Sequence, residues 1–166
     1  MKIAVLSDTH DNIWKLADAM PALAQADAVI HCGDFCSPFV IVHLGQGLAG
    51  KPVHGVWGNN DGDHRMLLLK AQEAGNVTIH GELAELELDG IRIAVNHYPQ
   101  IARGLAASGK YDLVCYGHDH TAHFSQVGET TLLNPGEIMG LMGARSFAFF
   151  DTQTRQVEFI PLDTNT

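Results

Sequence analysis

Three short apolar runs in the first half of the chain, separated by longer stretches with helical features, constrain the fold most. Residues 2–7, 28–32 and 53–57 are mainly apolar runs of strand length, which is typical of strands buried on both faces. A strand that is repeatedly followed by a helix predicts parallel pairing, because each helix returns the chain to the same edge of the sheet. The first half therefore predicts an α/β fold.

Three helices are predicted between and after these strands. The first is capped by Asn12 and runs to about residue 24, with Pro21 expected to kink or end it. The second begins at Ser37-Pro38, a cap followed by proline at the first helical position. The third covers residues 63–74 and stops at Gly75.

The second half of the chain consists mainly of predicted strands. Apolar and charged residues alternate on both sides of Asp89-Gly90, a two-residue turn that predicts an antiparallel hairpin. A short helix is predicted at residues 100–108. Turn residues separate the remaining predicted strands, which are residues 113–116, 123–127, 130–133, 146–150 and 156–160. Because no linker divides the two halves, we expect one domain over residues 1–166, with two sheets face to face and helices outside.

Charge and hydropathy exclude several functions. Ten Lys and Arg oppose 19 Asp and Glu, a formal charge of −9 without a basic cluster, which disfavours a large nucleic-acid partner. Apolar runs of about 18 residues are absent and residues 3–6 are too short for a signal peptide, so we expect a cytoplasmic protein without a membrane partner. Three cysteines without paired spacing are expected to be reduced thiols.

Residues with metal-binding chemistry follow the predicted strands. They are Asp8, His10, Asp34, Asn59, His97, His118 and His120. A single Asp after a strand is more often a helix cap or a turn former. Open α/β sheets, however, form ligand sites at the carboxyl ends of their strands, so the whole set predicts one site.

The other histidines and the large aromatic residues have simpler interpretations. The histidines within or beside predicted elements are expected to be structural: His31, His43, His54, His64, His80 and His123. Asp61 is expected to cap or orient the loop that carries Asn59. The aromatic residues expected in the core are Trp14, Trp57, Phe147 and Phe149.

The segments around the candidate ligands resemble, in order, the motifs of the calcineurin-like metallophosphoesterase superfamily. They are Asp8-Thr9-His10, Gly33-Asp34, Gly58-Asn59-Asn60-Asp61, His97 and Gly117-His118-Asp119-His120. The match runs from residue 3 to about residue 137, and Asn134-Pro135-Gly136 resembles the small bacterial and archaeal phosphodiesterase branch. The resemblance implies a four-layer α/β/β/α sandwich of two mixed β-sheets flanked by helices.

The resemblance also implies a site for two divalent metal ions. It places Asp8, His10 and His120 on the first ion, Asn59, His97 and His118 on the second, and Asp34 between them. A hydroxide that bridges the ions would attack phosphorus in line, which makes Asp34, Asn59 and His97 essential for catalysis. Nitrogen and oxygen ligands without a thiolate favour manganese, with iron, zinc or nickel as alternatives. The inner shell would then sum to a charge of about +1, which attracts a small phosphoester to an acidic protein.

Two positions depart from the family pattern. Asn60 occupies the place where the superfamily commonly has a histidine that assists the leaving oxygen, although the small branch commonly lacks that histidine too. Asparagine is not an acid, so hydrolysis is expected to depend on the leaving group. Glu137 stands where the branch often has serine. Its carboxylate would either repel dianionic monoesters at the mouth of the site or point to solvent.

Hydrolysis of a phosphodiester is the expected function. A phosphomonoesterase is the nearest alternative, and a non-catalytic protein-binding scaffold, like the relative of this fold in the retromer coat, is the third. The complete ligand set favours an enzyme, because unmetallated polar groups in one cleft would cost stability. Leu141 and Met142 lie in a segment that would serve self-association, line a pocket or be buried.

Overall fold

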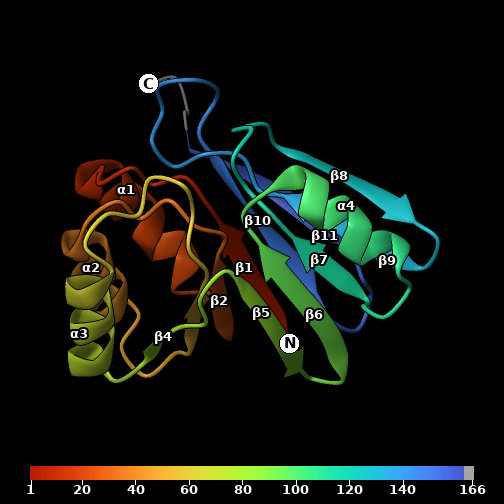
Figure 1. Ribbon diagram of the computed structural model, residues 1–166, viewed down its shortest axis with the longest axis horizontal. Coiled ribbons are helices and arrows are strands. Elements are labelled where there is room, and N and C mark those ends of the chain that lie inside the picture. Colours follow the sequence, from red (N-terminus) through yellow and green to blue (C-terminus); the bar gives the residue numbers. More distant parts are fainter. Residues whose placement is uncertain (163–166) are drawn as a thin grey trace.

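Two mixed β-sheets pack face to face in the computed structural model, which describes residues 1–162 (Figure 1). The six-stranded sheet has the order β11-β10-β1-β2-β3-β4, with β1 (Lys2–Leu6), β2 (Ala28–His31), β3 (Val53–Gly55), β4 (Val77–Ile79), β10 (Ser146–Asp151) and β11 (Val157–Pro161). The five-stranded sheet has the order β5-β6-β7-β9-β8, with β5 (Leu83–Leu88), β6 (Ile91–Asn96), β7 (Leu113–Cys115), β8 (His123–Val127) and β9 (Thr130–Asn134).

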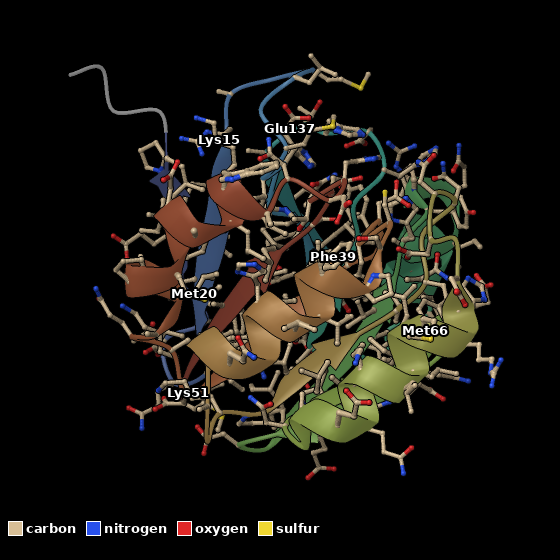
Figure 2. The ribbon with its side chains drawn as sticks, turned by 90° about the vertical axis from the view of Figure 1, so that its left-hand side faces the viewer. Lys15, Met20, Phe39, Lys51, Met66 and Glu137 are labelled. Carbon is tan, nitrogen blue, oxygen red and sulfur yellow. The ribbon has the colours of Figure 1, made fainter. Side chains whose placement is uncertain are left out.

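Helices cover the outer face of each sheet. The six-stranded sheet is covered by α1 (Ile13–Leu23), α2 (Pro38–Gly47) and α3 (His64–Ala74), whose arrangement is seen in Figure 2. The five-stranded sheet is covered by α4 (Pro99–Ala107), which packs on β6, β7 and β9 (Figure 1). The predicted order of layers, helices, sheet, sheet and helix, is confirmed.

Strand β1 shows why the central strands are continuously apolar. Ala4 and Leu6 pack in the core beneath the helices, whereas Ile3 and Val5 pack in the core between the sheets. All four side chains are fully buried. Since successive side chains of a strand point to opposite faces, a strand in the middle of four layers needs apolar residues at every position.

The helix boundaries follow the sequence signals closely. The Asn12 side chain accepts a hydrogen bond from the Lys15 amide at the start of α1, and Gly75 ends α3 in the left-handed conformation, with φ of 75°. Helix α1 continues for two residues beyond Pro21, to Leu23. Pro21 therefore does not terminate this helix, although its missing N–H leaves the helix without one hydrogen bond.

The structure corrects the predicted fold at two places. Strand β4 was not predicted, because three residues are too few to show a periodic pattern. The prediction that Trp14 belongs to the core is wrong, since this residue is 74% exposed. Helix α1 buries Leu16, Ala19 and Leu23, and a residue two positions before Leu16 lies on the opposite side of the helix. The other three predicted core aromatic residues, Trp57, Phe147 and Phe149, are buried.

The longest helices of residues 1–162 have 11 residues. None of the helices in this range is long and apolar enough to cross a membrane.

Candidate metal site

All seven predicted ligands lie in loops that follow strands at one end of the two sheets. The six-stranded sheet supplies Asp8 and His10 after β1, Asp34 after β2 and Asn59 after β3. The five-stranded sheet supplies His97 after β6, and His118 and His120 after β7. The candidate site therefore draws its side chains from both halves of the sequence, and the structure brings them together in two adjoining groups.

The first group contains Asp8, His10 and His120. Oδ1 of Asp8 lies 3.7 Å from Nε2 of His10 and 3.5 Å from Nε2 of His120. The two imidazole rings are stacked, with 5.3 Å between their centroids. One ligand atom from each of the three residues lies within 4.8 Å of the others, which is close enough for one cation to contact all three.

The second group contains Asn59, His97 and His118. Oδ1 of Asn59 lies 3.0 Å from Nε2 of His97 and 2.8 Å from Nδ1 of His118. The carboxylate of Asp34 connects the two groups, because its Oδ2 lies 3.5 Å from Nε2 of His97 and 3.4 Å from Nε2 of His10.

Two buried polar atoms in the first group have no hydrogen-bond partner among residues 1–162. They are Oδ1 of Asp8 and Nε2 of His10. Buried polar atoms are nearly always hydrogen-bonded, so such an atom in a native site requires an explanation. Both atoms face the other ligands of the group, and a cation in contact with them would satisfy both. The residues present therefore fit a divalent metal site.

The electrostatics of the two carboxylates point to the same conclusion. Burial alone would raise the pKa of Asp8, but contacts with His10 and Ser7 lower it below the usual value. Likewise, burial opposes ionisation of Asp34, yet hydrogen bonding from His97 and Asn60 lowers the pKa of this carboxyl. In turn, the Asp8 carboxylate raises the pKa of His10 to about 10. The site thus favours positive charge, which a cation supplies more strongly than a proton.

Unusual backbone conformations hold several candidate ligands in place. The left-handed region is occupied by Asp8 (φ 54°), His10 (φ 44°), Asp34 (φ 61°), His118 (φ 74°) and His120 (φ 57°). Such conformations cost roughly 1–2 kcal/mol for a non-glycine residue and cluster at functional sites. The loops also bind one another, because the Asp34 carbonyl accepts hydrogen bonds from the Thr9 and His10 amides at 3.1 and 3.0 Å.

Gly58 allows the loop after β3 to approach Asp34 closely. A Cβ atom at this position would lie 2.1 Å from Oδ1 and 2.4 Å from the backbone nitrogen of Asp34. The absence of a side chain is therefore a packing requirement of the site.

Asn60 and Asp61 orient the carboxylate and the backbone of Asp34. The Asn60 amide donates to Oδ1 of Asp34, and its side-chain Nδ2 donates to Oδ2, both at 2.8 Å. Oδ2 of Asp61 accepts the backbone N–H groups of Asp34 and Gly58 at 3.1 and 2.7 Å. The prediction that Asp61 orients the Asn59 loop is confirmed. The role of Asn60 in holding Asp34 was not predicted from the sequence.

The structure contradicts both alternatives considered for Glu137. This residue is fully buried, so its carboxylate neither points to solvent nor faces an incoming substrate at the mouth. Oε1 instead accepts three backbone N–H bonds, from Leu141, Met142 and Gly143, each at 2.9 Å. Oε2 lies 2.5 Å from Nδ1 of His120. A carboxylate without these donors would be costly to bury, and the loop after β9 supplies them.

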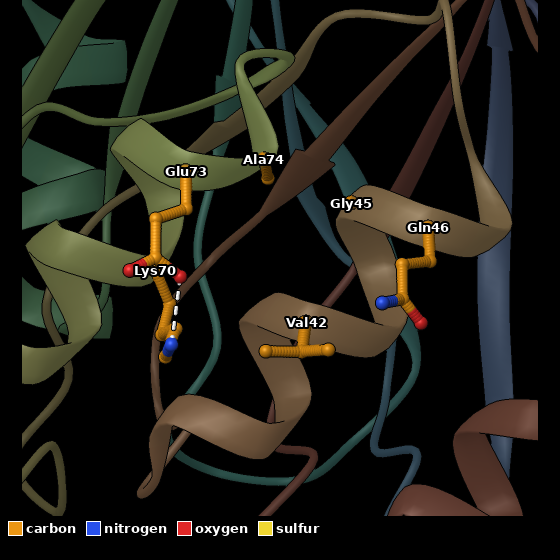
Figure 3. Close-up of a pocket in the computed structure, with 6 residues that line it drawn as sticks. All are labelled: Val42, Gly45, Gln46, Lys70, Glu73 and Ala74. Carbon is orange, nitrogen blue, oxygen red and sulfur yellow. Dashed lines mark hydrogen bonds and ion pairs between the residues drawn. The ribbon is translucent and has the colours of Figure 1, made fainter.

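The candidate ligands differ in their exposure to solvent. Asp8, Asp34 and His97 are buried, whereas Asn59 and His118 are exposed. The site is therefore open to solvent on the side of Asn59 and His118. The hollow in Figure 3 lies elsewhere, between α2 and α3, and is lined by Val42, Gly45, Gln46, Lys70, Glu73 and Ala74. None of these residues belongs to the predicted site.

The buried imidazole of His31 makes the fold sensitive to acid. Nδ1 of His31 accepts the Gly33 N–H at 3.2 Å, and Nε2 lies 2.7 Å from the Thr9 hydroxyl. Burial lowers the pKa of His31 to about 3, whereas an unfolded histidine titrates near 6.5. The folded state therefore binds fewer protons, so stability that is present above about pH 6.5 is lost as the pH falls toward 3.

When the pH falls from 8 to 4, the protonation of His31 on unfolding is expected to lower the free energy of unfolding of the metal-free protein by roughly 3 kcal/mol. Urea unfolding at several pH values measures this effect. The His31→Gln variant lacks the titrating ring, so its stability is expected to fall less over the same range. Identical pH dependence in the two proteins would contradict the assignment.

Comparison with known proteins agrees with this geometry. The family described as the calcineurin-like phosphoesterase superfamily domain matches residues 1–155. Phosphodiesterase MJ0936 of Methanocaldococcus jannaschii is 32% identical over 168 residues, which cover 98% of this chain and all of the relative. The probable metallophosphoesterase YsnB of Bacillus subtilis is 32% identical over 142 residues, covering 83% and 75%. A solved structure of a novel archaeal phosphodiesterase has a TM-score of 0.89 at 31% identity and covers 97% of this chain and 99% of that one.

The fold and the paired clusters of carboxylates and imidazoles define a metal-dependent phosphoesterase. The chain belongs to the calcineurin-like phosphoesterase superfamily.

Proposed function

We propose that this protein hydrolyses phosphodiesters with two divalent ions, and that the ions are manganese. Asp8, His10 and His120 hold one ion, Asn59, His97 and His118 hold the other, and Asp34 contacts both. The position of Asp34 carries the proposal, because its Oδ2 lies within 3.5 Å of an imidazole nitrogen from each group. The nitrogen and oxygen donor set is compatible with manganese.

Each part of the site has a distinct task in this proposal. When bound, the ions lower the pKa of water toward 7 and offset the negative charge of the phosphoryl oxygens. Asn60 keeps the Asp34 carboxylate in place through two hydrogen bonds, each 2.8 Å long. The exposed side chains of Asn59 and His118 border the path by which the substrate enters. The loops thus orient the reacting groups before the substrate arrives, which is a major source of catalytic rate.

A small phosphodiester is the proposed substrate class. Support comes from the similarity to the relative named phosphodiesterase MJ0936, which extends over 98% of this chain. The absence of a basic cluster from the sequence argues against a long nucleic acid as the substrate.

Hydrolysis of bis-p-nitrophenyl phosphate beside p-nitrophenyl phosphate tests the proposal. Metals are removed by chelation, manganese is restored, and iron, zinc and nickel are added in parallel samples. Manganese-dependent cleavage of the diester, faster than that of the monoester, is the expected result. A preference for the monoester would support a phosphomonoesterase instead. Inactivity on both with two ions bound would support a protein-binding scaffold.

The leaving group is expected to control the rate of hydrolysis strongly. The side-chain amide of Asn60 is hydrogen-bonded to Asp34 and has no proton to give to a leaving oxygen. General acid catalysis usually contributes about 10²–10⁴-fold to the rate. Without it, alkyl diesters are expected to react at least about 10²-fold more slowly than aryl diesters. A series of methyl aryl and methyl alkyl phosphates measures kcat/KM against the pKa of the leaving alcohol. Equal rates across the series would show that another group acts as the acid.

A further inference from the structure

A buried carboxylate in the loop after β9 and a candidate metal ligand in the loop after β7 form a hydrogen-bonded pair. Oε2 of Glu137 lies 2.5 Å from Nδ1 of His120, and the exposed fractions of the two side chains are 0% and 10%. The other ring nitrogen of His120, Nε2, lies 3.5 Å from Oδ1 of Asp8. The two nitrogens therefore have different neighbours, and only Nε2 lies beside the buried Asp8 oxygen that lacks a hydrogen-bond partner among residues 1–162.

The surroundings of Glu137 determine which ring nitrogen carries the hydrogen. Oε1 accepts the backbone N–H groups of Leu141, Met142 and Gly143, each at 2.9 Å, so the carboxylate is fixed in orientation. A carboxylate offers only acceptor atoms, so His120 must donate its Nδ1–H to Oε2. A neutral imidazole has one ring hydrogen, and Nε2 is then left with a free lone pair.

We propose that Glu137 is a positioning residue that holds His120 in the Nδ1–H tautomer, so that Nε2 can bind the cation shared with Asp8 and His10. The inference rests on the ligand set of the proposed function. Carboxylates that accept a hydrogen bond from a metal-binding histidine orient the ring and increase its basicity. In Figure 2 the labels of Glu137 and Lys15 lie toward one end of the molecule, and that of Lys51 lies toward the other. A hydrogen bond of 3.0 Å from the Asn12 side chain to the Met139 carbonyl connects the loop that carries Glu137 to the start of α1.

Glu137→Gln separates the two roles of this side chain, which are to accept the backbone N–H bonds of its loop and to accept the hydrogen bond from His120. The amide oxygen of glutamine can accept the same three backbone N–H bonds, so the loop is expected to keep its conformation. The amide nitrogen, in contrast, replaces Oε2 and donates toward Nδ1 of His120. His120 must then carry its hydrogen on Nε2, where it blocks the proposed ligand atom.

The affinity of the first manganese ion is expected to fall about 10–100-fold in Glu137→Gln, which is the usual effect of losing such a partner. Isothermal titration of the metal-free protein with manganese chloride measures this affinity. The melting temperature of the metal-free variant is expected to stay close to that of the native chain. Glu129→Gln makes the same chemical change at an exposed turn residue and serves as the control with native affinity.

Nuclear magnetic resonance reports the tautomer directly. Long-range ¹H–¹⁵N spectra of the metal-free protein at pH 8 are expected to show His120 protonated at Nδ1 in the native chain and at Nε2 in Glu137→Gln. A native His120 protonated at Nε2 would overturn the inference, and this measurement does not require a folded variant. Native manganese affinity in Glu137→Gln would also overturn it while leaving the proposed function intact. A native chain that binds no metal would overturn both.

Discussion

Asp34→Asn is expected to lower kcat for bis-p-nitrophenyl phosphate by roughly 10³-fold or more, because activation of water depends on ions that this carboxylate helps to hold. Its Oδ2 lies 3.4 Å from His10 and 3.5 Å from His97, between the two groups of ligands. Asparagine has nearly the same size and tolerates the left-handed φ of 61° at this position. The substitution therefore removes charge with little change in packing.

Steady-state kinetics in manganese and metal analysis of the dialysed protein test this expectation together. Asp112→Asn is a matched control, because it removes a carboxylate that pairs with Arg92 and Arg155 instead of the candidate ligands. The control is expected to retain native kcat. An Asp34→Asn protein with native kcat and two bound ions would show that Asp34 is not shared between them.

Gly58→Ala is expected to destabilise the protein by about 1–3 kcal/mol, the usual cost of adding a methyl group to filled space. The new Cβ would lie 2.4 Å from the backbone nitrogen of Asp34, which cannot rotate away as the end of a flexible side chain can. Either Asp34 or the loop that carries Asn59 must move. Misplacement of a catalytic group by about 1 Å can cost 10²-fold in rate, so kcat/KM is expected to fall by about that factor.

Gly62→Ala is the matched control, because it adds the same methyl group in the same loop without a close contact to Asp34. Its Cβ would meet only the Cys36 carbonyl oxygen, at an ordinary distance of 3.6 Å. Its stability is expected to stay within about 0.5 kcal/mol of the native value. Urea unfolding with a chelator measures stability, and kcat/KM in manganese measures the site. Equal losses in the two variants would contradict the role given to Gly58.

The layers of the fold could be predicted because buried strands leave a strong pattern in the sequence. Residues 3–6 and 28–30 are apolar at every position, and in the structure Ile3 and Ala4 pack in different cores. The candidate ligands could be predicted because they follow such strands and occur in the order of the family's motifs. Strand β4 was missed, since three residues give no periodicity. Trp14 was wrongly assigned to the core, since an aromatic residue does not itself indicate which face of a helix it occupies.

The supporting roles of Asn60 and Glu137, unlike that of Asp61, could not be predicted, because their partners are distant in the sequence. Asn60 holds a carboxylate 26 residues away, and Glu137 binds an imidazole 17 residues away. The position of Asn60 beside Asn59 was a usable signal. For Glu137 the signal of burial was its place directly before the apolar pair Ile138-Met139. Neither pattern identifies which backbone N–H groups the folded loop will offer.

The loop that carries Asp8 depends on hydrogen bonds from residues that lie far away in the sequence. The Ile138 and Met139 amides donate to the carbonyls of Ser7 and Asp8 at 3.2 and 3.0 Å. Strand β1 also pairs with β10, which places Lys2 opposite Asp151. Contacts between such distant residues slow folding. A fragment that ends before β10 therefore contains every candidate ligand but lacks one of the two strands that pair with β1, so the site is expected to assemble fully only when β10 has docked.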